Sequence, residues 1–150
     1  MNSTLSYSNF WQRRLYEYLH DYHPYMEDNQ QDMIDFIVMR ADNADKAYVQ
    51  ASDDGKNGLE CEDAGYDALF AGLEFSPFFY LIETCVDLYG YEMTKEEALE
   101  IYRYQEVKDI FDKYGNDIEG DDKEYQLIEE LTPYLKRYDG KGVVNQKFSI

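Results

Sequence analysis

The sequence predicts an all-α protein, a single compact domain of six or seven helices in an orthogonal or bundle-like arrangement. Three observations lead to this class. Apolar residues make up 44% of the 150 residues, and they recur mostly at helical spacing. Residues that cap helices precede several of these segments, and glycine or proline follows them. No segment alternates polar and apolar residues as a half-buried strand does. The length favours one domain over two, and we expect that domain to span residues 1–140.

The first two helices are predicted over residues 8–22 and 29–53. Apolar residues share one side of the first helix, and His23-Pro24 ends it because proline disfavours helical geometry in the residue before it. The second helix has a narrow apolar stripe, and Gly55 supplies its stop. The stripe consists of Met33, Ile37, Ala41, Ala44, Tyr48 and Ala51.

The third helix is predicted over residues 59–74 and has small residues on one face, among them Gly65 and Gly72. Each glycine inside a helix costs about 1 kcal/mol relative to alanine. Close approach of two backbones is the simplest reason to accept that cost. The alanines of the second helix offer a matching surface, so we predict a tight small-residue seam between these two helices.

The fourth helix follows Ser76, a capping residue, and begins at Pro77. Gly90 ends it. Thr94 and Glu97 form a capping box that opens the next helix. The apolar residues of that segment then change face, which predicts a break near residues 104–106. The alternative is one straight helix that is covered on both sides.

The last predicted helix covers residues 123–138, after a polar loop over residues 115–122. Pro133 lies inside this helix, removes one backbone donor and should bend it. Residues 141–150 have no helical period, and we expect them to form a frayed tail.

The charge excludes some functions and favours others. The formal net charge is −18, and residues 17–92 hold 18 acids against three bases. Phosphates would be repelled across most of such a surface, so we expect no direct binding of nucleic acid. No apolar run is long enough to cross a bilayer, and the first residues lack the features of an export signal. We therefore expect a cytoplasmic protein without a membrane partner.

No motif in the sequence carries recognisable chemistry. Cys61 and Cys85 lack the paired spacing of metal or redox sites and are interpreted as buried thiols. His20 and His23 could form half of a metal site, but zinc needs three or four ligands, so a capping or surface role is preferred. The acidic loop over residues 53–58 lacks the bidentate acid of a calcium loop. We predict no catalytic residue, no metal site and no cofactor.

Arg40 is the first candidate binding residue, because it is the only base between Arg14 and Lys46. Arginine is always charged and prefers a bidentate carboxylate. An ion pair with Glu74, Glu83 or Asp67 is the preferred interpretation, and a clamp for a ligand is the alternative.

The other candidates are acids of the second helix and tyrosines on turns. Asp32, Asp35 and Asp42 lie away from the apolar stripe and could meet a cationic partner. Tyrosine is enriched at protein interfaces, and the chain has 16 of them. Tyr25 and Tyr91, which lie on predicted turns, are the best placed for contacts.

Several groups of residues together resemble a known family. Their order and spacing are similar to a Bacteroidetes family labelled domain of unknown function 1896, with the strongest similarity between Phe36 and Ser76. The resemblance implies a small helical protein, often encoded near conjugative elements, and it implies no activity or functional residue. The groups are Phe36-Ile37, Arg40-Ala41-Asp42 with Ala44, Tyr48 and Ala51, Leu69-Phe70, Gly72-Leu73 and Phe75-Ser76.

Three functions are compatible with these observations. The preferred hypothesis is a non-catalytic module that binds another protein with a basic surface. The first alternative is an acidic mimic of DNA that inhibits a DNA-binding protein, because the acids of the second helix are spaced roughly 4.5–6 Å apart along its axis. The second alternative is an enzyme that uses carboxylates and a divalent metal.

Overall fold

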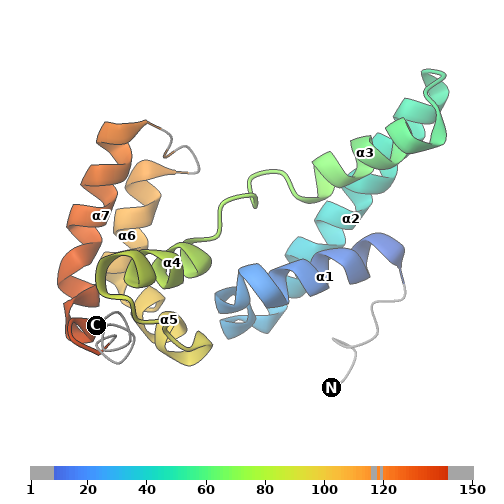
Figure 1. Cartoon of the computed structure of the whole chain (residues 1–150). Helices are drawn as coiled ribbons and strands as arrows, with labels where there is room; N and C mark the ends of the chain where they lie inside the picture. Colours follow the sequence, from blue (N-terminus) through green and yellow to red (C-terminus); the bar gives the residue numbers. More distant parts are fainter. Residues whose placement is uncertain (1–8, 116–117, 119, 142–150) are drawn as a thin grey trace. The chain divides into compact units, whose positions relative to one another are not determined.

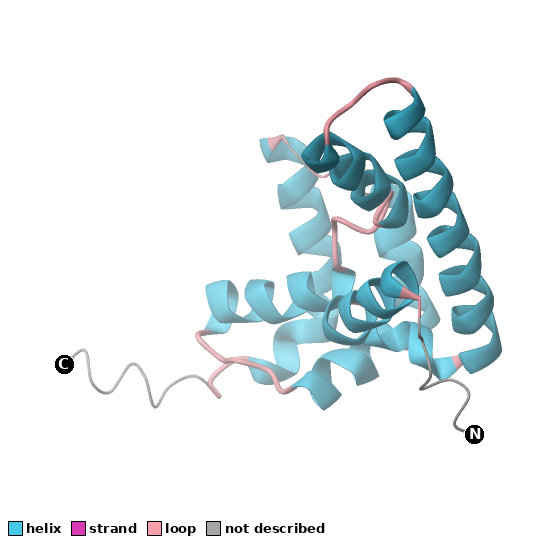
Figure 2. Ribbon diagram, turned by 90° about the vertical axis from the view of Figure 1, so that its right-hand side faces the viewer, coloured by secondary structure: helices cyan, strands magenta, loops and turns pink. Residues whose placement is uncertain are grey.

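A computed structural model of the chain describes residues 9–115, 118 and 120–141. These residues form seven α-helices and two short 3-10 helices, without any strand, so the predicted all-α class is confirmed (Figure 2). The chain folds as two compact units, Met1–Glu74 and Phe75–Ile150. We call them the first and the second unit. The single domain predicted for residues 1–140 stays a prediction.

The first unit is built on α1 (Phe10–Tyr22), α2 (Gln30–Asp53) and α3 (Gly58–Leu69), with a short 3-10 helix at Pro24–Asp28 (Figure 1). Asn9 caps α1 by accepting hydrogen bonds from the backbone of its first turn. His23 and Pro24 end α1 as predicted. The core combines one face of α1 with the stripe of α2. Its buried members are Trp11, Leu15, Leu19, Met33, Ile37, Ala41, Ala44 and Leu69.

Helices α2 and α3 lie against each other as an antiparallel pair, which confirms the predicted packing (Figure 1). The prediction for the glycines was wrong. Helix α3 ends at Leu69, and Gly72 lies beyond it with φ +77°, a left-handed turn geometry that a glycine adopts without strain. Gly65 faces the Trp11 ring of α1 rather than α2: a Cβ at residue 65 would lie 2.6 Å from Trp11 Cζ2.

One further residue departs from the predicted stripe of α2. Tyr48 was assigned to the buried face, but its side chain is 37% exposed. The core cluster reaches along α2 only to Ala44, and Ala51 is the next buried residue of that helix. Tyrosine tolerates this boundary position because its hydroxyl can stay in water.

The second unit contains α4 (Pro77–Tyr89), α5 (Lys95–Tyr102), α6 (Gln105–Tyr114) and α7 (Asp121–Leu135), followed by a 3-10 turn at Lys136–Tyr138. The predicted caps of α4 and α5 and the break between α5 and α6 are all confirmed. The core of this unit draws on all four helices. It consists of Phe78, Leu81, Cys85, Met93, Ala98, Ile101, Tyr102, Val107, Phe111, Leu127, Leu131, Leu135 and Tyr138.

Helix α7 begins at Asp121, two residues before the predicted start, and the helical geometry tightens after Leu135. Pro133 lies inside it as predicted. Glu130 ties α7 to α6 by accepting hydrogen bonds from the Tyr114 hydroxyl and from Lys113 Nζ, which lies 2.6 Å away. The predicted tail falls outside the described residues after Lys141. Among the helices that the structure describes, none is long and apolar enough to cross a bilayer.

Candidate functional site

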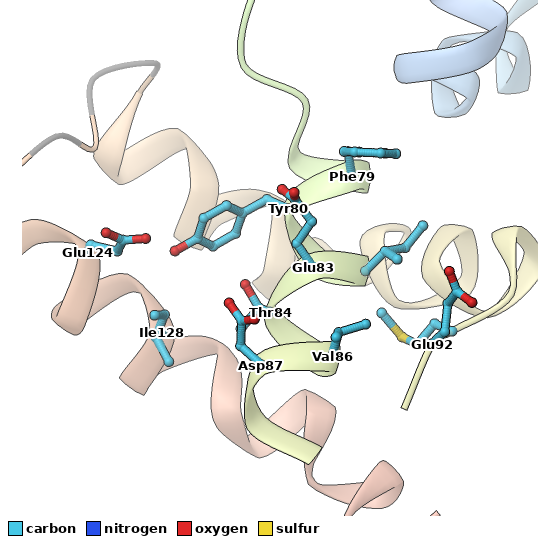
Figure 3. Close-up of a pocket in the computed structure, with 11 residues that line it drawn as sticks. Phe79, Tyr80, Glu83, Thr84, Val86, Asp87, Glu92, Glu124 and Ile128 are labelled. Carbon is cyan, nitrogen blue, oxygen red and sulfur yellow. The ribbon is translucent and has the colours of Figure 1, made fainter. Parts of the chain in front are cut away.

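The second unit carries a surface pocket of about 550 Å³ along one side of α4 (Figure 3). Eleven residues from α4, α7 and the segment after α4 line it. They are Phe79, Tyr80, Ile82, Glu83, Thr84, Val86, Asp87, Glu92, Met93, Glu124 and Ile128. All belong to one compact unit, so the pocket is a property of that unit alone.

The exposed face of α4 gives the pocket its apolar part. Phe78, Leu81 and Cys85 turn inward and are buried, and the helical period places Phe79 and Val86 on a different side. Their side chains are 43% and 42% exposed. Phe79 and Val86, seven residues apart, therefore share one exposed face of α4.

The polar part of the pocket is strongly acidic. Its lining holds four carboxylates and no basic residue, and the carboxylates come from Glu83, Asp87, Glu92 and Glu124. The carboxylates of Glu83, Asp87 and Glu92 form no hydrogen bond or ion pair with any residue that the structure describes. These charges are therefore available to a cation from outside the chain.

Tyr80 lies between the carboxylates of α4 and α7, with its hydroxyl directed toward Glu124 (Figure 3). Its ring packs against Phe75 and Phe111, with ring centroids 5.4 and 6.2 Å away. The hydroxyl oxygen is buried close to Thr84 and Glu124, without a hydrogen bond of normal geometry to either. Burial, and then the charge of Glu124, raises the pKa of Tyr80 to about 12. The hydroxyl therefore stays protonated at neutral pH.

Arg40, the first residue singled out in the sequence, binds a helix end in the first unit. Its Nη1 donates to the Leu69 carbonyl at 3.0 Å, and its guanidinium lies over the Phe36 ring, 4.7 Å from the centroid. The carbonyl at the C-terminus of α3 carries partial negative charge, so it takes the place of the carboxylate that the sequence analysis preferred. Within this unit Arg40 joins α2 to α3.

The three candidate acids of α2 are exposed. Asp32 lies in the first turn of the helix, where it meets the positive end of the helix dipole. Asp35 accepts a hydrogen bond from Gln31, and Asp42 pairs with Lys46 at 2.9 Å.

The two candidate tyrosines form internal contacts, one in each unit. Tyr91 donates its hydroxyl proton to Glu97 at 2.9 Å and stacks on Tyr138, with centroids 5.0 Å apart. The Tyr25 hydroxyl lies 2.5 Å from Nδ1 of His23. Both rings thus support the local fold. Their predicted role in binding a partner stays a prediction.

His23 is buried and connects α1 to the segment after α3. Its Nε2 lies 2.9 Å from the Leu73 carbonyl, which also accepts the Tyr18 hydroxyl proton at 2.9 Å. This arrangement fits a neutral imidazole that donates from Nε2 and accepts at Nδ1. Burial lowers the pKa of His23 below the ordinary value of 6.5.

We expect the stability of the first unit to fall as the pH falls below about 6.5, because the unfolded chain binds the His23 proton more readily than the folded one. The loss should not exceed about 1.4 kcal/mol per pH unit. Urea unfolding between pH 7.5 and 5.5, followed by the fluorescence of the single tryptophan, measures it. His23→Gln should flatten this dependence, whereas His20→Gln should keep it. An unchanged slope in His23→Gln would contradict the assignment.

The remaining sequence candidates form no common site. The Cys61 and Cys85 thiols are buried and free, as predicted, and burial raises the pKa of Cys85 to about 11. His20 is exposed, and its Nδ1 lies 3.2 Å from Glu27. In the described part of the chain, no three metal-binding side chains gather closely enough to hold an ion.

The fold and the pocket define a small, acidic, all-α protein with a surface pocket on one of its two helical units. The chain belongs to the family described as Domain of unknown function (DUF1896), whose model matches residues 1–138. The resemblance seen in the sequence is therefore confirmed. No curated protein and no solved structure matches the chain.

Sequence reasoning did not find the α4 pocket. The sequence shows where α4 begins and ends, and Phe79 and Val86 lie on a face of this helix away from its buried residues. Their separation of seven residues, with Glu83 between them and Asp87 beside them, is the signal that could have been used.

Proposed function

We propose that the chain is a non-catalytic module that binds a basic segment of another protein in the α4 pocket. One observation carries the proposal: an exposed apolar face is bordered by four carboxylates and by no base. Such a surface is complementary to a segment that has both apolar and cationic side chains.

The apolar part of the pocket supplies affinity. Removing apolar surface from water contributes about 25 cal/mol per Å², and Phe79 and Val86 are each more than two-fifths exposed before binding. Aromatic side chains of this kind are common among the residues that dominate binding energy. A segment that covers both side chains would gain most of its affinity there.

The charge of the chain determines which partners bind and raises the rate at which they associate. A net charge of −18 repels acidic partners and nucleic acid and attracts basic ones over a distance that salt shortens. The free carboxylates of Glu83, Asp87 and Glu92 then meet the cation at short range. Binding should accordingly weaken when the salt concentration rises.

The proposal is preferred to mimicry of DNA because of the exposed face of α2. Val38 and Met39, both 49% exposed, lie between Asp35 and Asp42, and Lys46 pairs with Asp42. The acids of α2 are thus interrupted by apolar groups and by a base, unlike a row of phosphates. A variant of these acids is included in the test below.

Selection of a random peptide library on the full chain tests the proposal without a known partner. We expect enriched peptides to lose at least about tenfold in affinity for the variant Phe79→Ser/Val86→Ser, which corresponds to about 1.4 kcal/mol. The matched control is Val49→Ser/Leu59→Ser, which removes two exposed apolar side chains of the first unit. This control should bind as the parent chain does.

Three outcomes would count against the proposal. One is that no peptide is enriched. Another is that the enriched peptides bind both double variants equally. The third is that the enriched peptides lose affinity for the variant Asp35→Asn/Asp42→Asn but not for Phe79→Ser/Val86→Ser, because mimicry of DNA would place the binding surface on the acids of α2.

A further inference from the structure

We infer that the partner segment places an arginine side chain at the polar end of the α4 pocket, between Asp87 and Glu124, and an apolar side chain next to it on Phe79 and Val86. This inference rests on the proposed function and specifies the chemistry of the partner. It assigns a separate role to each end of the pocket.

The polar end is suited to a large organic cation rather than to a metal ion. Side chains of Thr84 and Asp87 from α4 and of Glu124 from α7 approach the same space as Tyr80 (Figure 3). A divalent metal needs several oxygens within about 2.0–2.6 Å of one point. No group of three such side chains meets this requirement among the residues the structure describes. A cation that spans the separate carboxylates fits better.

A guanidinium group matches this spread of acceptors more closely than an ammonium group does. It is planar, has five N–H donors that point outward, and binds carboxylates in pairs of hydrogen bonds. Its several donors allow one guanidinium group to bind carboxylates from two helices, and Asp87 of α4 and Glu124 of α7 line the same pocket. It is also more weakly hydrated than an ammonium group, so moving it into a partly apolar pocket costs less.

The Tyr80 side chain prepares the polar end for this occupant. Contacts with Phe75 and Phe111 fix its ring, so the hydroxyl has little freedom to move. The hydroxyl lies close to the Glu124 carboxylate without a hydrogen bond of normal geometry, so that carboxylate can still accept from a ligand. When Glu124 turns to meet the ligand, its carboxylate can also accept a hydrogen bond from the Tyr80 hydroxyl, which then holds the carboxylate in place.

The geometry of α4 predicts how far apart the arginine and the apolar residue lie in the partner segment. Asp87 lies one residue after Val86 and two helical turns after Tyr80, and the polar and apolar ends are thus neighbours on one helix. A partner helix would present both anchors if they were three or four residues apart. We therefore expect enriched peptides to have arginine at that spacing from a large apolar residue.

The test compares three versions of one enriched peptide, titrated into the full chain. Replacing its arginine by citrulline, which keeps the shape and removes the charge, should weaken binding at least about tenfold, which corresponds to about 1.4 kcal/mol. Replacing it by lysine should weaken binding several-fold. Equal affinity of the citrulline peptide would overturn the inference, and equal affinity of the lysine peptide would overturn the preference for a guanidinium group.

These results separate the inference from the proposed function. If peptides depend on Phe79 and Val86 but have no essential arginine, the module binds proteins and the inference is wrong. If no peptide depends on these residues, the proposed function itself fails.

Tyr80→Phe provides a second test with a readout in the free protein. Removing an unpaired buried hydroxyl should leave the melting temperature unchanged or raise it, while the arginine peptide should bind several-fold more weakly. The citrulline peptide should bind both proteins alike. A lower melting temperature would show that the hydroxyl has a partner in the free fold, and unchanged affinity for the arginine peptide would show that the hydroxyl takes no part in binding.

Discussion

Gly65→Ala is expected to lower the free energy of unfolding of the first unit by about 1–3 kcal/mol, although alanine is the better helix former. The added Cβ would lie 2.6 Å from Trp11 Cζ2 and closer still to the neighbouring ring atom. Trp11 cannot move away easily, because its ring has edge-on contacts with Phe10 and Tyr66 at centroid distances of 5.1 Å. Urea unfolding followed by far-ultraviolet circular dichroism measures the loss.

The same substitution should change sign when the tryptophan is absent. Trp11→Ala alone should cost about 3–5 kcal/mol, because it empties a buried site in the core of the first unit. On that background Gly65→Ala should stabilise by up to about 1 kcal/mol through helix propensity. Gly58→Ala is the matched control, since a Cβ at residue 58 meets nothing within 4 Å. Equal effects of Gly65→Ala on both backgrounds would mean that Trp11 does not pack on Gly65.

Reversing two charges at the polar end of the α4 pocket should have the largest effect on binding. We expect Asp87→Lys/Glu124→Lys to weaken an arginine-containing peptide at least about a hundredfold, or about 2.7 kcal/mol. Like charges brought together in a partly buried site cost several kcal/mol. Isothermal titration at one fixed salt concentration measures the change.

The matched control separates this local effect from the net charge. Glu62→Lys/Asp63→Lys changes the net charge of the chain by the same amount on exposed residues of α3. It should weaken binding only slightly, through reduced long-range attraction. If both double variants weaken binding equally, the peptide responds to the overall charge and has no defined place in the pocket.

The sequence predicted most of the helices because their ends carry local signals. Ser76 and Pro77 start α4, Thr94 with Glu97 starts α5, and the change of apolar face places the break before α6. Each of these signals acts within a few residues and depends little on the rest of the fold. The same reasoning gave the stripe of α2, apart from the boundary residue Tyr48.

Glycine was the residue that sequence reasoning could not resolve. A glycine in a helical segment can allow close packing, or it can end the helix in left-handed geometry. The sequence alone does not distinguish these two roles. Gly65 does the first, against a tryptophan 54 residues earlier in the chain, and Gly72 does the second. Only the tertiary contacts distinguish the two cases.

The candidate site could not be predicted from the sequence either. Its lining comes from α4, from the Glu92-Met93 segment and from α7, and a chain so rich in acids offers many such combinations. Arg40 attracted attention because it is isolated among acids, but its partner is the backbone carbonyl of Leu69, which has no signature in the sequence. Tyr91 is likewise held by Glu97 and Tyr138.

Nuclear magnetic resonance mapping of an enriched arginine peptide on the full chain tests the central claim most directly. Our account predicts that the backbone signals of residues 79–87, together with those around Glu92 and Glu124, shift in proportion to the bound fraction. Signals of α2 and α3 should stay in place. Shifts confined to α2 or α3, with α4 unaffected, would contradict the assignment of the α4 pocket as the binding site.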